Sequence, residues 1–280
     1  MDHSGNHLRY RLLALDLDGT LVGRDLHVPP VTIEAIAAYQ AAGGHVTLAT
    51  GRTFRTTMPF VELLRIDAPI ICYQGALIRD PRSGDVLFHE PVPPELAVEA
   101  AEGLLTAGIY VQAYVDDELV VPYEGDETRL YRSFSPVHLP VHVVEDLPAF
   151  LATHPPTKLL FIAHEGEVGP RVAGLQTHFA ERLNVARSHA FFGELTAPGC
   201  TKGRALANLA TILQIPREAV AAAGDQENDV SMVEWAGLGM GVRSGPPALH
   251  AVANVLIDGP EEAGLAAGIR RYLLNQPAAA

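Results

Sequence analysis

The sequence is poor in cysteine and in basic residues. Its two cysteines, Cys72 and Cys200, offer neither a disulfide framework nor a metal-ligand spacing, so each is predicted to be a small buried side chain. The 20 lysines and arginines are outnumbered by 33 aspartates and glutamates, which gives a formal net charge of −13, and the sequence contains no basic run. This balance repels phosphate backbones and argues against a nucleic-acid partner.

Long apolar runs are also missing. The apolar stretches are broken by charge or glycine before they reach the roughly 18 residues that a membrane span requires. The first residues, MDHSGNHLRYR, lack the apolar core of a signal peptide. The sequence therefore predicts a soluble cytoplasmic protein without a membrane partner.

Several common ligand-binding motifs are incomplete or absent. A calcium loop that began at Asp16 would need glycine and glutamate at its sixth and twelfth positions, where Leu21 and His27 stand. The loop that begins at Asp225 fails at the same two positions. No complete G-x-G-x-x-G or G-x-x-x-x-G-K-[ST] motif occurs, and the twelve histidines show no metal-ligand spacing. Calcium-loop, dinucleotide-binding and P-loop proteins are thereby disfavoured.

Strand-like and helix-like segments alternate near the N-terminus. The apolar residues 12–15 and the segments HVTLAT and APIICY are typical of buried strands. Between the first two, VTIEAIAAYQAAG repeats Ile33, Ile36 and Ala37 at helical spacing before Gly43, and a second helix is predicted around Phe60, Leu63 and Leu64. This alternation indicates an α/β fold with a parallel sheet covered on both faces.

The pattern changes in the middle of the chain and then resumes. A helical stretch at 93–108 and two strands around a polar turn at 110–123 predict a separate α+β unit. Alternation returns with a helix at 201–213 and strands at 219–224, 237–242 and 254–257. We therefore predict a doubly wound, Rossmann-like core domain made of residues 1–79 and 190–280, with an inserted α+β cap domain at 80–189.

Polar residues follow three of the predicted core strands. Asp16 ends the first strand and Asp18 lies two residues later, Thr50-Gly51-Arg52 follows the second, and Asp225 follows the strand at 219–224. Because ligands bind beyond the carboxyl ends of parallel strands, these groups are expected to face one crevice. Lys202, in the first turn of its helix behind a possible Thr201 cap, is a cation where the helix dipole disfavours one.

Ordinary structural explanations exist for each of these residues taken singly. Asp18-Gly19 could close a turn, Thr50 could cap a strand end, Lys202 could be a solvated charge, and Asp229 could start a helix. They do not explain why such residues occur at several strand ends together.

A cluster of Asp16, Asp18, Asp225 and Asp229 would need a cation. Two carboxylates in close contact repel by about 4 kcal/mol at an effective dielectric near 20. Oxygen ligands with room for water suit Mg²⁺. A hydroxyl, a lysine and backbone N–H groups beside the metal suit a phosphoryl group, and a central carboxylate can act as the nucleophile that forms an aspartyl-phosphate.

The combination resembles the haloacid dehalogenase superfamily. Its four motifs are matched by DLDGTL, Thr50-Gly51-Arg52, Lys202-Gly203, and Gly224-Asp225 with Asn228-Asp229. The inserted unit and the closing segments DVSMVEWAGLGMGV and ANVLID resemble the Cof-like phosphatases of that superfamily. The resemblance covers about residues 12 to 274.

This resemblance implies a Mg²⁺-dependent phosphatase that hydrolyses small phosphorylated metabolites, either sugar phosphates or phosphorylated cofactors, through an aspartyl-phosphate. Asp16 is the implied nucleophile, and Asp18 the implied general acid, whose backbone carbonyl also touches Mg²⁺ in the family. The remaining implied roles are phosphate binding by Thr50, Gly51, Lys202 and Asn228, metal binding by Asp225 together with Asp16 and Asp18, and support behind the metal by Asp229. A phosphotransferase such as a phosphosugar mutase and a catalytically idle phosphate-ligand-binding protein are the alternatives.

Two positions depart from the family pattern. Gln74-Gly75 stands where Asn-Gly is common, which puts a polar role for the longer side chain in doubt. Met240-Gly241-Val242 stands where Met-Gly-Asn is frequent, which removes a polar group near the crevice.

Overall fold

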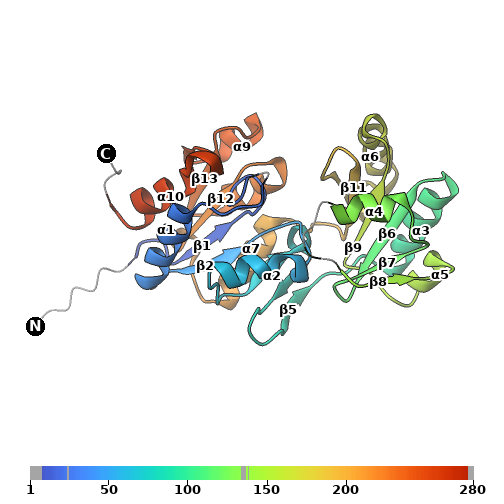
Figure 1. Cartoon of the computed structure of the whole chain (residues 1–280), viewed down its shortest axis with the longest axis horizontal. Coiled ribbons are helices and arrows are strands. Elements are labelled where there is room, and N and C mark those ends of the chain that lie inside the picture. Colours follow the sequence, from blue (N-terminus) through green and yellow to red (C-terminus); the bar gives the residue numbers. More distant parts are fainter. Residues whose placement is uncertain (1–7, 24, 134–136, 138, 277–280) are drawn as a thin grey trace, which may run out of the picture. The chain divides into compact units, whose positions relative to one another are not determined.

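The computed structural model describes residues 8–23, 25–133, 137 and 139–276. The chain forms two compact units: the first consists of Met1–Gly51, Met58–Leu87 and Thr201–Ala280, and the second of Arg52–Thr57 and Phe88–Cys200 (Figure 1). The backbone therefore passes from one unit to the other four times. In the described part of the chain, no helix combines the length and the apolar character that crossing a membrane requires.

The first unit is built on a five-stranded parallel sheet with strand order β14-β13-β12-β1-β2. Its strands are β1 (Leu12–Leu15), β2 (His45–Leu48), β12 (Val220–Gly224), β13 (Leu238–Val242) and β14 (Val255–Ile257). All four residues of β1 are buried, and Leu12 pairs with Val220 on one side and His45 on the other. The predicted parallel α/β sheet is confirmed.

A short antiparallel sheet extends this unit. It contains β3 (Ile70–Cys72), β4 (Leu77–Arg79) and β5 (Val86–His89), and a bridge between Ala49 and Ile71 joins it to the end of β2. Cys72 and Cys200 are both buried, as predicted.

The helices of the first unit pack in pairs, α1 (Pro30–Ala41) against α10 (Gly264–Gly268) and α7 (Lys202–Ile212) against α8 (Val230–Trp235). The unit also contains most of α2 (Phe54–Leu63) and all of α9 (Pro247–Val252). The helix predicted at 201–213 is present as α7, and its Leu206, Leu209 and Ala210 are buried.

The predicted apolar face of α1 is only partly correct, because Ile36 is buried and Ile33 is half-buried. Its buried residues are Thr32, Ala35, Ile36 and Tyr39, whereas Ala37 is exposed. Apolar residues occur on all sides of this helix, so their spacing along the sequence does not show which side is packed against the rest of the unit. Tertiary contacts hold it in place, among them the packing against α10 and a hydrogen bond of 2.9 Å from the Tyr39 hydroxyl to the Tyr10 carbonyl.

The second unit is built on a six-stranded sheet with strand order β10-β11-β9-β6-β7-β8. Its strands are β6 (Tyr110–Val115), β7 (Glu118–Val121), β8 (Val141–Val143), β9 (Lys158–Ile162), β10 (Asn184–Arg187) and β11 (Phe192–Thr196). The predicted hairpin at 110–123 is present as β6 and β7. Because β11 pairs with β9, the unit runs on to Cys200, beyond the expected boundary at 189.

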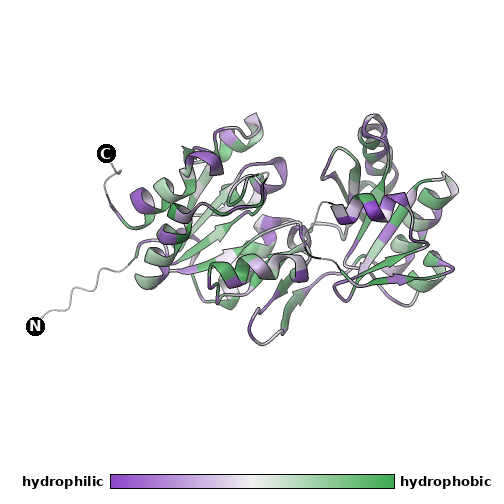
Figure 2. Ribbon diagram, in the orientation of Figure 1, coloured by the Kyte–Doolittle hydropathy of each residue, from purple (hydrophilic) through white to green (hydrophobic). Residues whose placement is uncertain are grey.

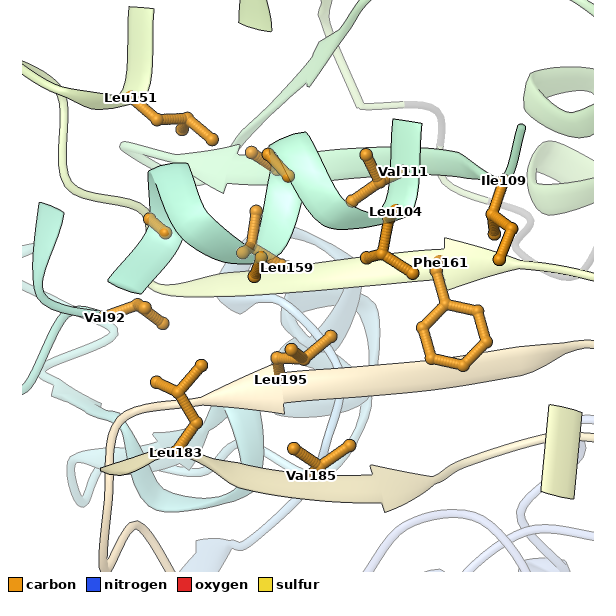
Figure 3. Close-up of a cluster of buried hydrophobic side chains, with 14 of the residues drawn as sticks. Val92, Leu104, Ile109, Val111, Leu151, Leu159, Phe161, Leu183, Val185 and Leu195 are labelled. Carbon is orange, nitrogen blue, oxygen red and sulfur yellow. The ribbon is translucent and has the colours of Figure 1, made fainter. Parts of the chain in front are cut away.

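The helices of the second unit are α3 (Pro94–Thr106), α4 (Asp126–Ser133), α5 (Leu147–Leu151) and α6 (Glu165–Phe179). Val111, Leu159 and Phe161 of the sheet pack with Leu104 of α3 in a buried cluster (Figure 3). Most strand residues of both units are hydrophobic (Figure 2). The second unit thus has a hydrophobic core of its own.

Candidate active site

Two aspartates follow neighbouring central strands of the first unit. Asp16 comes directly after β1 and Asp225 directly after β12, and the Asp16 N–H donates to the Ala223 carbonyl at 3.0 Å. From β1 the strand order runs outward to β2 on one side and to β12 on the other, so this is the switch point of the sheet, where open α/β folds bind ligands. Both aspartates are more than nine-tenths buried.

Lys202 joins two of the carboxylates. Its ammonium donates to Asp16 Oδ1 at 2.5 Å and to Asp229 Oδ1 at 2.6 Å, and its side chain is completely buried. The helix that carries it begins there because the Thr201 hydroxyl accepts a hydrogen bond of 3.1 Å from the Arg204 N–H. Burial alone would lower the pKa of Lys202, but the carboxylates of Asp16 and Asp229 raise it, so the ammonium stays charged.

Asp229 is fully committed to protein partners. One oxygen binds Lys202, and the other accepts from the backbone N–H groups of Asp225 at 2.9 Å and Gln226 at 3.0 Å. Gly224 permits this closeness, because a Cβ at that position would lie 2.3 Å from Asp229 Cβ. This geometry fits a role in holding Lys202 and Asp225 more than direct metal ligation.

The Asp16 carboxylate is only partly satisfied by the described residues. Its Oδ2 atom is buried and has no hydrogen-bond partner among the described residues. Burial raises the pKa of the Asp16 carboxyl well above its usual range and Asp229 adds to this, while Lys202 opposes the shift. Burial, and then the charge of Asp229, also raise the pKa of Asp225.

The donor set fits a divalent cation. Asp16, Asp225 and Asp229 each present a carboxylate oxygen, and these oxygens lie within 4.8 Å of one another. Lys202 binds two of these three carboxylates, so a cation would relieve the repulsion that remains among them. Oxygen ligands of this kind are those that Mg²⁺ prefers.

Asp225 is oriented by residues whose role the sequence did not reveal. The Thr20 hydroxyl donates to Asp225 Oδ1 at 3.1 Å, and the Gln226 amide donates to Oδ2 at 2.9 Å. Gly19 has a φ of +93°, and a Cβ there would lie 2.2 Å from Asp225 Oδ2. The Asp-Gly pair signalled a turn, but not that this turn would contact a residue 205 positions away from Thr20.

Asp18 lies in this turn and is exposed. The turn is closed by hydrogen bonds from the Gly19 N–H to the Val22 carbonyl at 2.8 Å and from the Leu21 N–H to the Leu17 carbonyl at 3.0 Å. Among the described residues, the group of three carboxylates does not include Asp18. The side chain of Asp18 is therefore more accessible than that of Asp16.

The expected phosphate ligands belong to the same unit. Thr50 and Gly51 follow β2, and Thr50 is buried. Asn228 is exposed at the carboxyl end of β12, and its amide donates to Gln74 Oε1 at 3.0 Å.

Comparison with known proteins gives consistent results. The sequence model of the haloacid dehalogenase-like hydrolases matches residues 13–269. Pyridoxal phosphate phosphatase YbhA of Escherichia coli is 30% identical, with 88% of this chain and 93% of that protein covered. The 5-amino-6-(5-phospho-D-ribitylamino)uracil phosphatase YitU of Bacillus subtilis is 28% identical, with 93% and 97% covered. A crystal structure of a haloacid dehalogenase-like hydrolase from Bacteroides thetaiotaomicron superposes with a TM-score of 0.84 at 26% identity, covering 94% of this chain and 99% of that one.

Proposed function

Because the chain belongs to the haloacid dehalogenase-like hydrolases, we propose that it is a Mg²⁺-dependent phosphatase of small phosphorylated metabolites that works through an aspartyl-phosphate. The observation that carries the proposal is the Asp16 carboxylate, with one oxygen bound to Lys202 and the other without a partner among the described residues. The relatives of this chain include phosphatases named for pyridoxal phosphate and for a phosphoribitylaminouracil. Phosphate monoesters of nitrogen heterocycles are therefore the first substrates to test.

In the first step, Asp16 Oδ2 attacks phosphorus while the bond from phosphorus to the ester oxygen breaks. The Asp18 carboxyl gives its proton to the departing oxygen, and the product alcohol leaves. Lys202 binds Asp16 Oδ1 and so leaves Oδ2 available for the attack. Mg²⁺ would be held by the carboxylates of Asp16 and Asp225 and by the Asp18 backbone carbonyl, and would supply neutralisation of the phosphoryl charge.

In the second step, water attacks the phosphorus of the aspartyl-phosphate and its proton passes to the Asp18 carboxylate. The bond from phosphorus to Asp16 Oδ2 breaks, which releases inorganic phosphate and restores both side chains. The exposure of Asp18 suits this exchange of protons with two different oxygens. Thr50, Gly51, Lys202 and Asn228 are assigned to binding the phosphoryl oxygens.

Replacing Asp16 by Asn tests this function. The substitution keeps the shape but removes the nucleophilic charge, so phosphate release should fall by several orders of magnitude. The measurement is phosphate release from a panel that contains pyridoxal phosphate, sugar phosphates and nitrophenyl phosphate, with Mg²⁺ or with excess chelator. Turnover by Asp16→Asn comparable to that of the parent, or full activity in chelator, would contradict the mechanism.

The same panel separates the alternatives. A phosphotransferase would move phosphate to a second sugar hydroxyl without releasing it, which product analysis with an added sugar detects. A catalytically idle binding protein would retain phosphate without turnover, although such a pocket would have no need for both Asp16 and Asp18.

A further inference from the structure

The turn after β3 has an unusual backbone. Tyr73, Gln74 and Gly75 have φ values of +53°, +60° and +105° in succession. Two consecutive non-glycine residues in this region are strained, and such strain persists only where the surroundings enforce it. Packing requires glycine at position 75, because a Cβ there would lie 2.4 Å from the carbonyl oxygen of Thr201, the residue before Lys202.

This backbone brings Gln74 against three of the expected phosphate ligands. Its N–H donates to the Thr50 carbonyl at 3.0 Å, and its Oε1 accepts from Asn228 Nδ2 at 3.0 Å. A Cβ on residue 51 would lie 2.4 Å from Gln74 Nε2, so the side-chain amide lies directly on Gly51.

We propose that Gln74 is a positioning residue for phosphate binding, which acts by orienting the Asn228 amide and seating the Thr50-Gly51 segment. This inference rests on the proposed function. By accepting from Nδ2, Gln74 Oε1 selects one orientation of the Asn228 amide at a position that is otherwise exposed. The hydrogen bond from the Gln74 N–H to the Thr50 carbonyl fixes the backbone of Gln74 in the strained turn. The Gln74 side chain therefore extends to Asn228 from a backbone with little freedom to move.

The length of the side chain matters in this arrangement. An asparagine at position 74 would be shorter by one methylene group, and from the same backbone it could not span the distance to Asn228. Glutamine at this position is therefore a functional feature of the chain and not a neutral replacement.

Two variants test the proposal. Gln74→Leu removes the amide, and Gln74→Asn keeps a polar side chain that tolerates positive φ but shortens it. Both should raise the KM for phosphate esters, and the Kd for inorganic phosphate measured by calorimetry with Mg²⁺, by about 5- to 20-fold, since one oriented hydrogen bond to a charged group is weakened. The kcat should fall by less than about threefold, because the chemical groups on Asp16 and Asp18 are untouched.

Gln214 provides a matched control. It is another glutamine with positive φ, +54°, but it is exposed beyond the end of α7. Gln214→Leu therefore imposes the same substitution on the same kind of backbone, and it should leave the KM and the Kd unchanged. Thermal unfolding of the Gln74 variants that matches that of Gln214→Leu would exclude a general loss of structure.

A double substitution shows whether Gln74 acts through Asn228. In an Asn228→Ala background, Gln74→Leu should weaken phosphate binding by less than about twofold, because the partner that it orients is gone. If the loss of phosphate affinity in the double variant equalled the product of the losses in the two single variants, the proposal would be contradicted. Parental KM and Kd values in both Gln74 variants would contradict it as well. If the parent bound phosphate in a Gln74-dependent way but hydrolysed nothing, the proposed function would fail and this inference would stand.

Discussion

The residue on which the candidate site depends most for stability is Lys202. Replacing Lys202 by Met would leave the buried carboxylates of Asp16 and Asp229 facing each other without a cation. Removing one partner of a buried ion pair typically costs about 3–5 kcal/mol. We expect a decrease of that size in the free energy of unfolding in urea without Mg²⁺, and a partial recovery when Mg²⁺ is added.

Arg204→Met is the control, because Arg204 is an exposed cation on the same turn of α7. That substitution should cost less than about 1 kcal/mol, as surface changes usually do. A loss of stability in Lys202→Met as small as the one in Arg204→Met would show that something other than the ammonium compensates the charge of the two carboxylates.

At this scale the sequence predicted that Asp16, Asp225 and Asp229 converge, but it also placed Asp18 in the cluster, which the structure does not, and it did not show how each carboxylate is used. Asp16, Asp225 and Lys202 meet because they follow or cap elements whose ends share one edge of a parallel sheet. The commitment of both Asp229 oxygens, the support of Asp225 by Thr20 and the contact between Gln74 and Asn228 depend on side-chain orientation across long sequence separations. A periodic pattern contains no information about such contacts.

Among the elements, α2 begins in an uncommon way. Its first two N–H groups, from Phe54 and Arg55, donate at 2.9 and 2.7 Å to the carboxylate of Asp117 in the β6–β7 turn, and Thr53 Oγ1 accepts from the Thr56 N–H at 3.1 Å. Asp117 is buried, and its negative charge complements the helix dipole. This capping explains why Arg52–Thr57 belongs to the second unit.

Removing this cap should loosen the first turn of α2. Asp117→Ala is expected to lower the free energy of unfolding by about 1–2 kcal/mol, the usual cost of losing an N-terminal cap, and to speed hydrogen exchange at Phe54 and Arg55. Asp116→Ala is the control, because Asp116 is exposed and has a positive φ in the same turn. Equal exchange rates at Phe54 in the two variants would refute the capping role.

The elements also show where sequence patterns stop being informative. The strands of the core were predictable because short apolar runs between helical segments leave few alternatives, and the hairpin at 110–123 because a polar pair separates two β-rich runs. The packed face of α1 and the place of residues 52–57 in the second unit were not predictable, because both involve tertiary contacts such as Tyr39 with Tyr10 and Phe54 with Asp117.

For the molecule as a whole, the division into two units places the proposed active-site residues in one of them. Every residue assigned above to the nucleophile, acid, metal or phosphate roles lies in the first unit, whereas the buried cluster around Phe161 lies in the second. Each unit therefore has its own means of staying folded. Binding of phosphate and Mg²⁺ is expected to survive without the inserted segment.

Replacing Phe88–Cys200 by a short glycine–serine linker tests this expectation. The remaining chain should still bind inorganic phosphate with Mg²⁺ and cleave nitrophenyl phosphate, while its ranking of larger phosphate esters should flatten if the removed unit selects the leaving group. The deletion also removes Asp117, so the first turn of α2 next to Thr50-Gly51 loses its cap, and full-length Asp117→Ala measures that contribution separately. A truncated chain that keeps the parent's substrate ranking, after correction for the Asp117→Ala effect, would place selection in the first unit.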